Sequence, residues 1–352
     1  MSDKDKKLFK ELCAEFSDII TPRPGRYNNN SGHVDNSINF VEKPAPNQKV
    51  YQPKYSDVMK AHLATKMDKL FDWGVLVYPE SVGVTCEFLS PSMIIPKAEK
   101  GEYRLVTDFG ALNRYIRKPP TASPTIQEAK NALAKKPYFC HLDLSNYYYQ
   151  SGMSREDIQY LGVLHPYKGV LAYSVEPQGL KGASEHAYEK LGRIFGSMCQ
   201  VGTAFRQADS LFALGDSLPE LRKNLREIFV KIRANGLTLK PSKIIVAPRK
   251  SVLFGWNWEE GLWSPTIHTT SALERIPLPK TSTQLRSYLG SFKQFSDCIR
   301  NYGDILSPLE KMTGEKGLKL SWTEDQEAAF RASQKAIADL QGVYIRVFSS
   351  CP

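Results

Sequence analysis

The chain has 352 residues, of which 41% are hydrophobic and 24% are charged. This composition supports a large buried core and excludes an intrinsically disordered chain. Lys and Arg number 47 and Asp and Glu 37, so the formal net charge is +10. A positive balance favours polyanionic partners such as nucleic acids, although a basic soluble protein without such a partner has the same charge.

The cysteines and the N-terminus exclude several further classes of protein. The six cysteines are scattered and include no CxxC pair, which argues against a zinc site and favours free thiols in a reducing compartment. The N-terminus carries alternating charges, and no stretch reaches the roughly 20 apolar residues of a membrane span. We therefore expect no signal peptide, no membrane association, and an intracellular location in the cytoplasm or nucleus.

The first half of the chain predicts an arm followed by mixed helices and strands. Residues 1–50 are interrupted by prolines, which indicates an extended arm with one short helix near Leu8 to Phe16. An apolar face over Ser56 to Trp73 predicts a helix that Gly74 ends. Strands are expected at 75–78, 93–96, 103–109 and 139–144.

The second half predicts an α+β arrangement that becomes mostly helical. Helices are expected at 184–198 and 218–235, and strands at 244–247 and 252–256 joined by a short basic turn. Beyond residue 277, two capping-box patterns mark helix starts, at Thr281 with Gln284 and at Thr323 with Gln326. A helix bearing Arg286, Lys293 and Arg300 would present three cations seven residues apart, which fits either a nucleic-acid backbone or an ordinary solvated face.

Asp143 follows an apolar strand segment, where a carboxylate can project into a cleft. Nucleotidyl transfer uses two divalent cations held by carboxylates from separate parts of the chain. A lone Asp at such a position is more often a turn or cap residue, so the assignment depends on its neighbours.

Those neighbours form an ordered set of motifs between about Gln52 and Leu340. The set comprises YRLVTDF at 103–109, DL at 143–144 with Tyr148 and Gln150, PQGLKGA at 177–183, GL at 236–237 with Lys243, FG at 254–255, YLG at 288–290 and WT at 322–323. In order and spacing they resemble the polymerase domain of reverse transcriptases from gypsy-type LTR retrotransposons and, more distantly, retroviruses.

The resemblance implies an α+β right-hand polymerase with palm, fingers and thumb and a ferredoxin-like palm. It divides the chain into an N-terminal extension (1–50), fingers and palm (51–262), thumb and connection (263–340) and a C-terminal tail (341–352). Because few residues follow Leu340, we expect no RNase H domain. Whether the chain is cut from a polyprotein stays open.

The resemblance also implies site residues. Asp143 and Asp209 would be the catalytic carboxylates and would hold Mg²⁺, or alternatively Mn²⁺. Tyr148 would exclude a 2′-hydroxyl by bulk, and Arg104, assisted by Lys97 or Lys100, would bind the triphosphate of the incoming dNTP. Gln178 would contact the nucleotide or the template. Lys243 would approach its phosphates as a general acid.

Three positions depart from the family pattern. The second catalytic motif reads Gln207-Ala208-Asp209-Ser210, with Ser210 in place of a second aspartate and Gln207 in place of an aromatic residue. Gly110 stands where a basic residue is expected. Two functions therefore remain: an RNA-directed DNA polymerase that extends a primer on RNA or DNA, or a catalytically impaired descendant that binds nucleic acid or scaffolds a protein or ribonucleoprotein partner.

Overall fold

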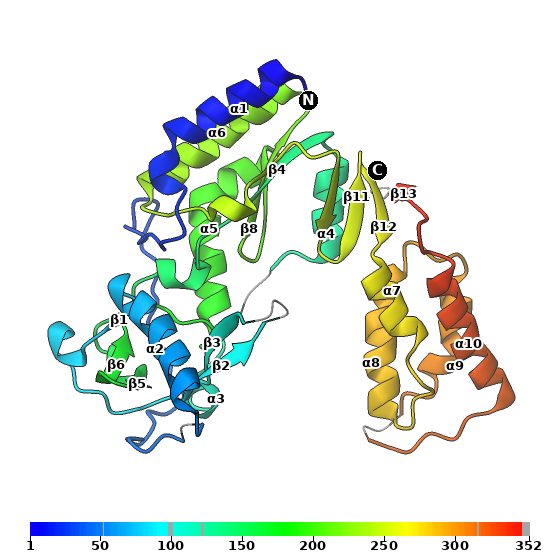
Figure 1. Cartoon of the computed structure of the whole chain (residues 1–352). Helices are drawn as coiled ribbons and strands as arrows, with labels where there is room; N and C mark the ends of the chain where they lie inside the picture. The colour runs from blue at the N-terminus through cyan, green and yellow to red at the C-terminus, as the bar shows by residue number, and fades with distance from the viewer. Residues whose placement is uncertain (52, 98–100, 121–122, 315–316, 347–352) are drawn as a thin grey trace. The chain divides into compact units, whose positions relative to one another are not determined.

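The computed structural model describes residues 1–51, 53–97, 101–120, 123–314 and 317–346 (Figure 1). Lys100 and Cys351 lie outside this described part. The chain divides into two compact units. The first unit comprises Met1–Thr125 and Tyr138–Ala247, and the second comprises Ile126–Pro137 and Pro248–Pro352.

A four-stranded antiparallel sheet is the centre of the first unit, and its order is β7-β8-β4-β9. Its strands are β4 (Tyr138–Asp143), β7 (Ala204–Gln207), β8 (Ser210–Gly215) and β9 (Ile245–Val246). Helices α5 (Ala183–Gln200) and α6 (Leu218–Ala234) pack on this sheet. Their apolar faces and the inward side chains of β4 and β8 form one core that includes Leu142, Leu211 and Phe229.

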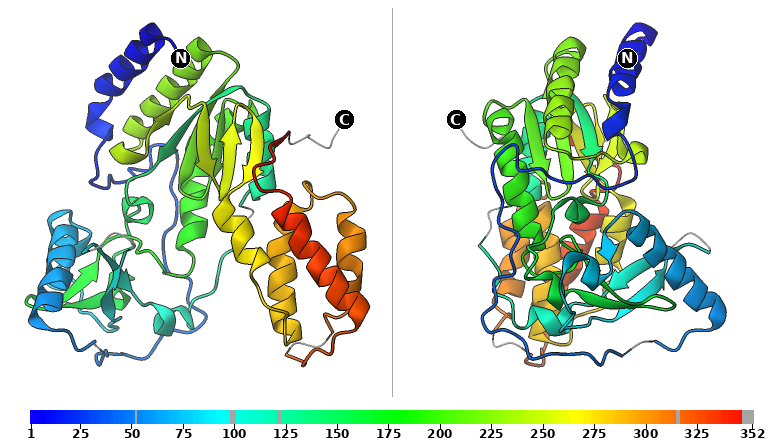
Figure 2. Two further views of the ribbon diagram at one scale, coloured as in Figure 1. Left: turned by 45° about the vertical axis from the view of Figure 1, so that its right-hand side comes forward. Right: turned by 90° about the vertical axis from the view of Figure 1, so that its left-hand side faces the viewer.

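The N-terminal residues are tied to this core rather than free. Helix α1 (Asp3–Glu15) begins at the Ser2 cap, is longer than the sequence predicted, and runs beside α6 (Figures 1 and 2). In the segment that follows α1 in sequence, Gly25 lies so close to Gly236 that an added Cβ would be 2.2 Å from the Gly236 carbonyl oxygen. Only glycine permits this backbone approach.

Two small sheets form the rest of the first unit. One has the order β1-β6-β5, from β1 (Leu76–Val77), β6 (Gly169–Tyr173) and β5 (Gly162–His165). The other pairs β2 (Ser92–Pro96) with β3 (Tyr103–Thr107). Helix α2 (Asp57–Asp72) is capped by Ser56 and buries Leu63, Met67 and Leu70 against these sheets, as its periodicity predicted. Short helix α3 (Gly110–Asn113) follows β3.

The second unit joins a sheet of order β10-β11-β12-β13 to helices. Its strands are β10 (Lys250–Leu253), β11 (Trp256–Glu259), β12 (Leu262–Pro265) and β13 (Ile345–Arg346). Its helices are α4 (Ile126–Ala134), α7 (Ile267–Glu274), α8 (Ser282–Phe292), α9 (Tyr302–Glu310) and α10 (Glu324–Ala338). Lys130 of α4 is buried, with its ammonium 2.9 Å from the centre of the Trp256 ring.

One sequence expectation about this unit is wrong. Residues 252–256 do not form one strand, because Phe254 and Gly255 have φ of 54° and 79° and make the turn between β10 and β11. The strand expected at 244–247 is present as β9, which belongs to the first unit and pairs with β4 there.

The expected basic helical stripe is also wrong. Helix α8 ends at Phe292, so only Arg286 lies within it, while Lys293 is its C-cap and Arg300 lies beyond it. The Arg286 guanidinium donates to the carbonyls of Thr313 and Gly314, and Lys293 pairs with Glu310 at 3.2 Å. These two cations therefore have structural partners.

Of the two expected capping boxes, that of Thr323 and Gln326 is complete. At the start of α8, the Thr281 side chain accepts from the Gln284 N–H, but the Gln284 side chain accepts from Lys280 instead. Within the described residues, no helix is long and apolar enough to cross a membrane.

Candidate active site

The candidate site begins where β4 ends. Asp143 is the last residue of this strand, and its partner across the antiparallel pair with β8 is Ser210. The strand stops because Asn146 adopts a left-handed conformation, with φ of 47°, and starts the 3₁₀ turn Tyr147–Gln150. The carboxylate of Asp143 is therefore held on a rigid strand at the edge of a turn.

Asp209 reaches the same place from the hairpin between β7 and β8. Gln207 pairs with Ser210, so Ala208 and Asp209 form a two-residue turn. The backbone N–H of Leu144 donates to the Asp209 carbonyl at 3.4 Å, which ties this turn to the residue after Asp143. The structure thus brings together the two carboxylates that the sequence analysis selected.

Their electrostatics fit a divalent cation. Burial raises the pKa of Asp143, and the nearby Asp209 charge raises it further, while Lys240 and Lys243 oppose the shift. In the described part of the chain, neither carboxylate has a salt-bridge or side-chain hydrogen-bond partner. Two close carboxylates without a direct ion pair are a donor set that Mg²⁺ or Mn²⁺ accepts. Among the described residues, no group of three or more His, Cys, Asp or Glu side chains is placed to hold a metal ion.

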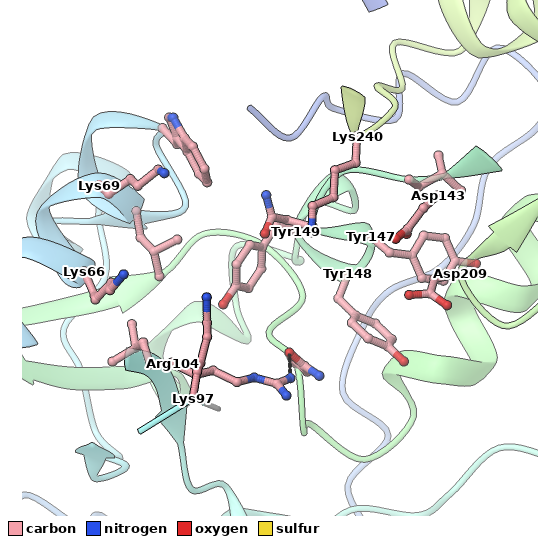
Figure 3. A pocket seen from close by; sticks show the side chains of 16 residues that line it. Lys66, Lys69, Lys97, Arg104, Asp143, Tyr147, Tyr148, Tyr149, Asp209 and Lys240 are labelled. Atoms are coloured by element: carbon pink, nitrogen blue, oxygen red, sulfur yellow. Dashed lines mark hydrogen bonds between the residues drawn. The ribbon is translucent and has the colours of Figure 1, made fainter. Parts of the chain in front are cut away.

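The carboxylates line an open pocket of about 520 Å³. Its opposite wall is cationic: Lys66 and Lys69 come from α2, Lys97 directly follows β2, and Arg104 comes from β3 (Figure 3). Tyr148 lies between the carboxylates and this wall (Figure 3). A pocket with anionic ligands at one end and several cations at the other matches the charge pattern of a metal–polyphosphate complex.

Arg104 and Gln178 meet in this pocket although they are 74 residues apart in sequence. Nη2 of Arg104 donates to Oε1 of Gln178 at 2.9 Å. The loop that carries Gln178 is fixed by Asn113, whose amide donates to the Gly179 carbonyl and whose Oδ1 accepts from the Lys181 N–H. Gly179 has φ of 94°, a conformation that disfavours other residues.

Tyr148 is half-buried in the turn after β4. Burial raises its pKa, and the charges of Asp209, Glu176 and Glu185 add to the effect. The turn itself is secured by Gln150, which is fully buried and bonds to Ser145 and Thr238. The tyrosine is therefore fixed close to Asp209.

Lys240, which no sequence motif singled out, lines the pocket, and its backbone N–H donates to the Asp143 carbonyl at 2.9 Å. Lys243, which the motifs singled out, is exposed in the 3₁₀ helix Pro241–Lys243 and does not line the pocket. The signal for Lys240 was weak because the path of the chain past Asp143 depends on the pairing of β9 with β4. Lys97 lines the pocket, while Lys100 is outside the described residues.

Two departures from the family pattern have local explanations. The Ser210 hydroxyl forms a 3.0 Å hydrogen bond with Nε2 of His141. At Gly110, the backbone N–H donates to Oδ1 of Asp108 at 2.7 Å, and an added Cβ would be 2.9 Å from that oxygen. A side chain at position 110 would therefore require Asp108 to move.

Comparisons with known proteins agree with this geometry. No family model matches the sequence. The chain is 22% identical over 330 residues to the retrovirus-related Pol polyprotein of transposon 412 from Drosophila melanogaster. The match covers 92% of this chain and 26% of that polyprotein. It is 24% identical over 239 residues to the transposon Tf2-3 polyprotein of Schizosaccharomyces pombe, covering 68% of this chain and 18% of the polyprotein.

Solved structures show the same fold. A foamy viral protease–reverse transcriptase in complex with double-stranded DNA gives a TM-score of 0.78 at 16% identity, over 99% of this chain and 58% of that one. A foamy viral protease–reverse transcriptase in complex with an RNA/DNA hybrid gives 0.71 at 17% identity, over 96% and 44%. The chain thus spans only part of the proteins that it matches.

The chain has the α+β fold of a right-hand polymerase with a ferredoxin-like palm, as expected. In sequence it is similar to part of two retrotransposon Pol polyproteins, and in fold it is similar to foamy viral protease–reverse transcriptases, in agreement with the resemblance read from its motifs.

Proposed function

We propose that the chain is an RNA-directed DNA polymerase that extends a primer with dNTPs on an RNA or DNA template. The observation that carries this proposal is the pocket in which Asp143 and Asp209 face Arg104, Lys97 and the half-buried Tyr148. Similarity to reverse transcriptases supports the same reading.

Each group has a physical role in the proposed reaction. Asp143 and Asp209 would hold Mg²⁺ or Mn²⁺, which when bound lowers the pKa of the primer 3′-hydroxyl and neutralises the triphosphate. Arg104 offers a planar fork of donors to phosphate oxygens, and its bond to Gln178 orients that fork. Tyr148 restricts the space below the sugar, so a 2′-hydroxyl would clash.

Two lysines near Asp143 are candidates for contact with the triphosphate of the incoming dNTP. Lys243 was expected as the general acid for pyrophosphate, but Lys240 lines the pocket with Asp143. We therefore propose Lys240 as a phosphate contact. Lys243 acts at longer range, because its charge still lowers the pKa of Asp143.

In the second unit, we propose one cation as a nucleic-acid contact in place of the three that the sequence suggested. Arg300 is exposed and, among the described residues, has no ion-pair or hydrogen-bond partner, whereas Arg286 and Lys293 do. Arg300 is therefore the member of the predicted trio that is free to bind a nucleic-acid backbone.

Ser210 favours a second candidate function, a nucleic-acid-binding protein or ribonucleoprotein scaffold with impaired catalysis. Replacing a carboxylate with a hydroxyl removes one negative charge beside the cation site, which weakens cation binding. In this case the chain would bind template and primer without extending the primer.

Primer extension on RNA and DNA templates, with Mg²⁺ and with Mn²⁺, tests the proposal. Wild type should incorporate dNTPs, and Asp143→Asn and Asp209→Asn should abolish incorporation while leaving template–primer binding intact. Asp216→Asn is a matched control, because Asp216 follows β8 at the end remote from Ser210 and does not line the pocket. Salt-sensitive nucleic-acid binding without incorporation in wild type would establish the second candidate instead.

A further inference from the structure

Ser210 stands at an unusual position relative to the proposed cation site. It is the direct partner of Asp143 across the antiparallel strands β8 and β4. Opposed residues of such a pair point to the same face of the sheet, so a ligand at position 210 would be expected to face the pocket. Ser210 nevertheless is not among the residues that line the pocket, while its neighbour Asp209 is.

The Ser210 hydroxyl is engaged diagonally across the strands instead. It bonds to Nε2 of His141, two residues before Asp143 and on the same face of β4, at 3.0 Å. The His141 ring is held in turn by Phe212, the residue opposite it, at a centroid distance of 4.6 Å and an interplanar angle of 8°. Phe212 is fully buried. The imidazole therefore has a fixed orientation when it meets the hydroxyl.

The adjoining turn needs such a fixed neighbour. Ala208 has φ of 50°, a left-handed conformation that is unfavourable for a non-glycine residue. Alanine has no side-chain oxygen or nitrogen to stabilise this turn locally. The bond from the Leu144 N–H to the Asp209 carbonyl is long, at 3.4 Å. Ser210, the first residue of β8, is therefore the position from which a side chain can hold the turn.

We propose that His141 and Ser210 are a positioning pair that fixes the Ala208–Asp209 turn and holds the Asp209 carboxylate beside Asp143. The pair rests on the proposed function, because it assigns a cation to these two carboxylates. Position 210 is then part of the support of the cation site and not a vacant ligand position. Aspartate introduced there would follow the same diagonal path and accept a hydrogen bond from His141.

Two readouts on the full chain test the pair: one measures metal binding, and the other does not depend on a metal. Mn²⁺ binding is measured by electron paramagnetic resonance, and hydrogen exchange of the segment 204–215 is measured by mass spectrometry without metal. Ser210→Ala removes the hydroxyl, and His141→Phe removes the hydrogen bond while keeping an aromatic ring on Phe212. Ser210→Thr retains the hydroxyl, and Ser197→Ala, on the exposed face of α5, is the matched control.

We expect Ser210→Ala and His141→Phe each to weaken Mn²⁺ binding about tenfold, the effect typical of losing a residue that orients a metal ligand. Both variants should also accelerate exchange in segment 204–215, whereas Ser210→Thr and Ser197→Ala should behave as wild type. Ser210→Asp should not tighten Mn²⁺ binding. Unchanged melting temperatures separate this loss from general unfolding.

Opposite results identify which idea fails. Tighter Mn²⁺ binding by Ser210→Asp, with Ser210→Ala and His141→Phe like wild type, overturns the pair and makes position 210 a vacant ligand position. Unchanged exchange in both removal variants also overturns it, whether or not Mn²⁺ binds. Absence of Mn²⁺ binding in wild type and Asp143→Asn alike overturns the proposed function, and exchange still decides the pair.

Discussion

Gln150 secures the site by a set of hydrogen bonds whose loss has a calculable effect. Its Nε2 donates to the carbonyls of Ser145 at 2.7 Å and Thr238 at 3.0 Å, and its Oε1 accepts from the Thr238 N–H at 2.8 Å. The side chain is fully buried. It therefore joins the residues after Asp143 to the segment that leads to Lys240.

Gln150→Leu keeps the approximate volume and removes all three bonds. At about 1 kcal/mol for each bond, the free energy of unfolding of the first unit should fall by about 3 kcal/mol. The loss can be larger, because the Ser145 carbonyl and the Thr238 N–H would lose the partner that Gln150 provides, whereas the Thr238 carbonyl keeps its bond from the Ser145 N–H. With a urea dependence of about 3 kcal/mol per molar, the unfolding midpoint should fall by about 1 M.

The assay is urea unfolding read by hydrogen exchange on peptides from α5 and α6, so that the first unit is followed separately. Gln159→Leu is the matched control, because Gln159 is partly exposed and its side chain makes one hydrogen bond, to the Glu156 carbonyl. A shift for Gln150→Leu no larger than that of the control would refute the reasoning. Primer extension should fall in parallel, since the displaced segments bear Asp143 and Lys240.

Three further perturbations follow from the same geometry. Asp143→Asn should raise the melting temperature at pH 7 by about 1–3 °C. Burial and the Asp209 charge raise the pKa of Asp143 in the folded state. The stability that the protonated carboxyl contributes is therefore lost as pH rises through that pKa. A melting-temperature series from pH 7 to 3.8 should show the gain shrinking on acidification, and a gain that is independent of pH contradicts this cause. Tyr148→Val should reduce discrimination against ribonucleotides about 10- to 100-fold in single-nucleotide insertion kinetics, and unchanged discrimination would exclude the steric role. A double-mutant cycle between Lys130→Met and Trp256→Leu should give a coupling of about 1–2 kcal/mol in unfolding of the second unit, because the ammonium lies 2.9 Å from the ring centre; additive effects would show that the contact contributes little.

The sequence was informative where local patterns carry structure. Helix α2 follows from its apolar periodicity and its Ser56 cap, and α10 follows from the complete capping box of Thr323 and Gln326. These features depend on neighbours within a few residues, so they survive without knowledge of the fold. The turn at Phe254 and Gly255 was missed because a non-glycine residue with positive φ has no strong local signal.

Local sequence patterns did not predict which segments far apart in the chain contact one another. Segment Ile126–Pro137 lies between elements of the first unit in sequence but belongs to the second unit, where Lys130 packs on Trp256. The expected basic stripe was wrong because α8 ends at Phe292, and the partners of Arg286 and Lys293 lie 17 to 28 residues away. A seven-residue spacing shows a common helical face only when the helix continues.

The sequence by itself predicted the polymerase fold and singled out Asp143 and Asp209, because its motifs have the order and spacing of a known family. Only the tertiary structure placed these two carboxylates in one pocket and replaced Lys243 with Lys240 along its wall. It also showed that Ser210 meets His141. That contact depends on the register of β4 with β8, and strand register is set by pairing between segments almost 70 residues apart in the chain.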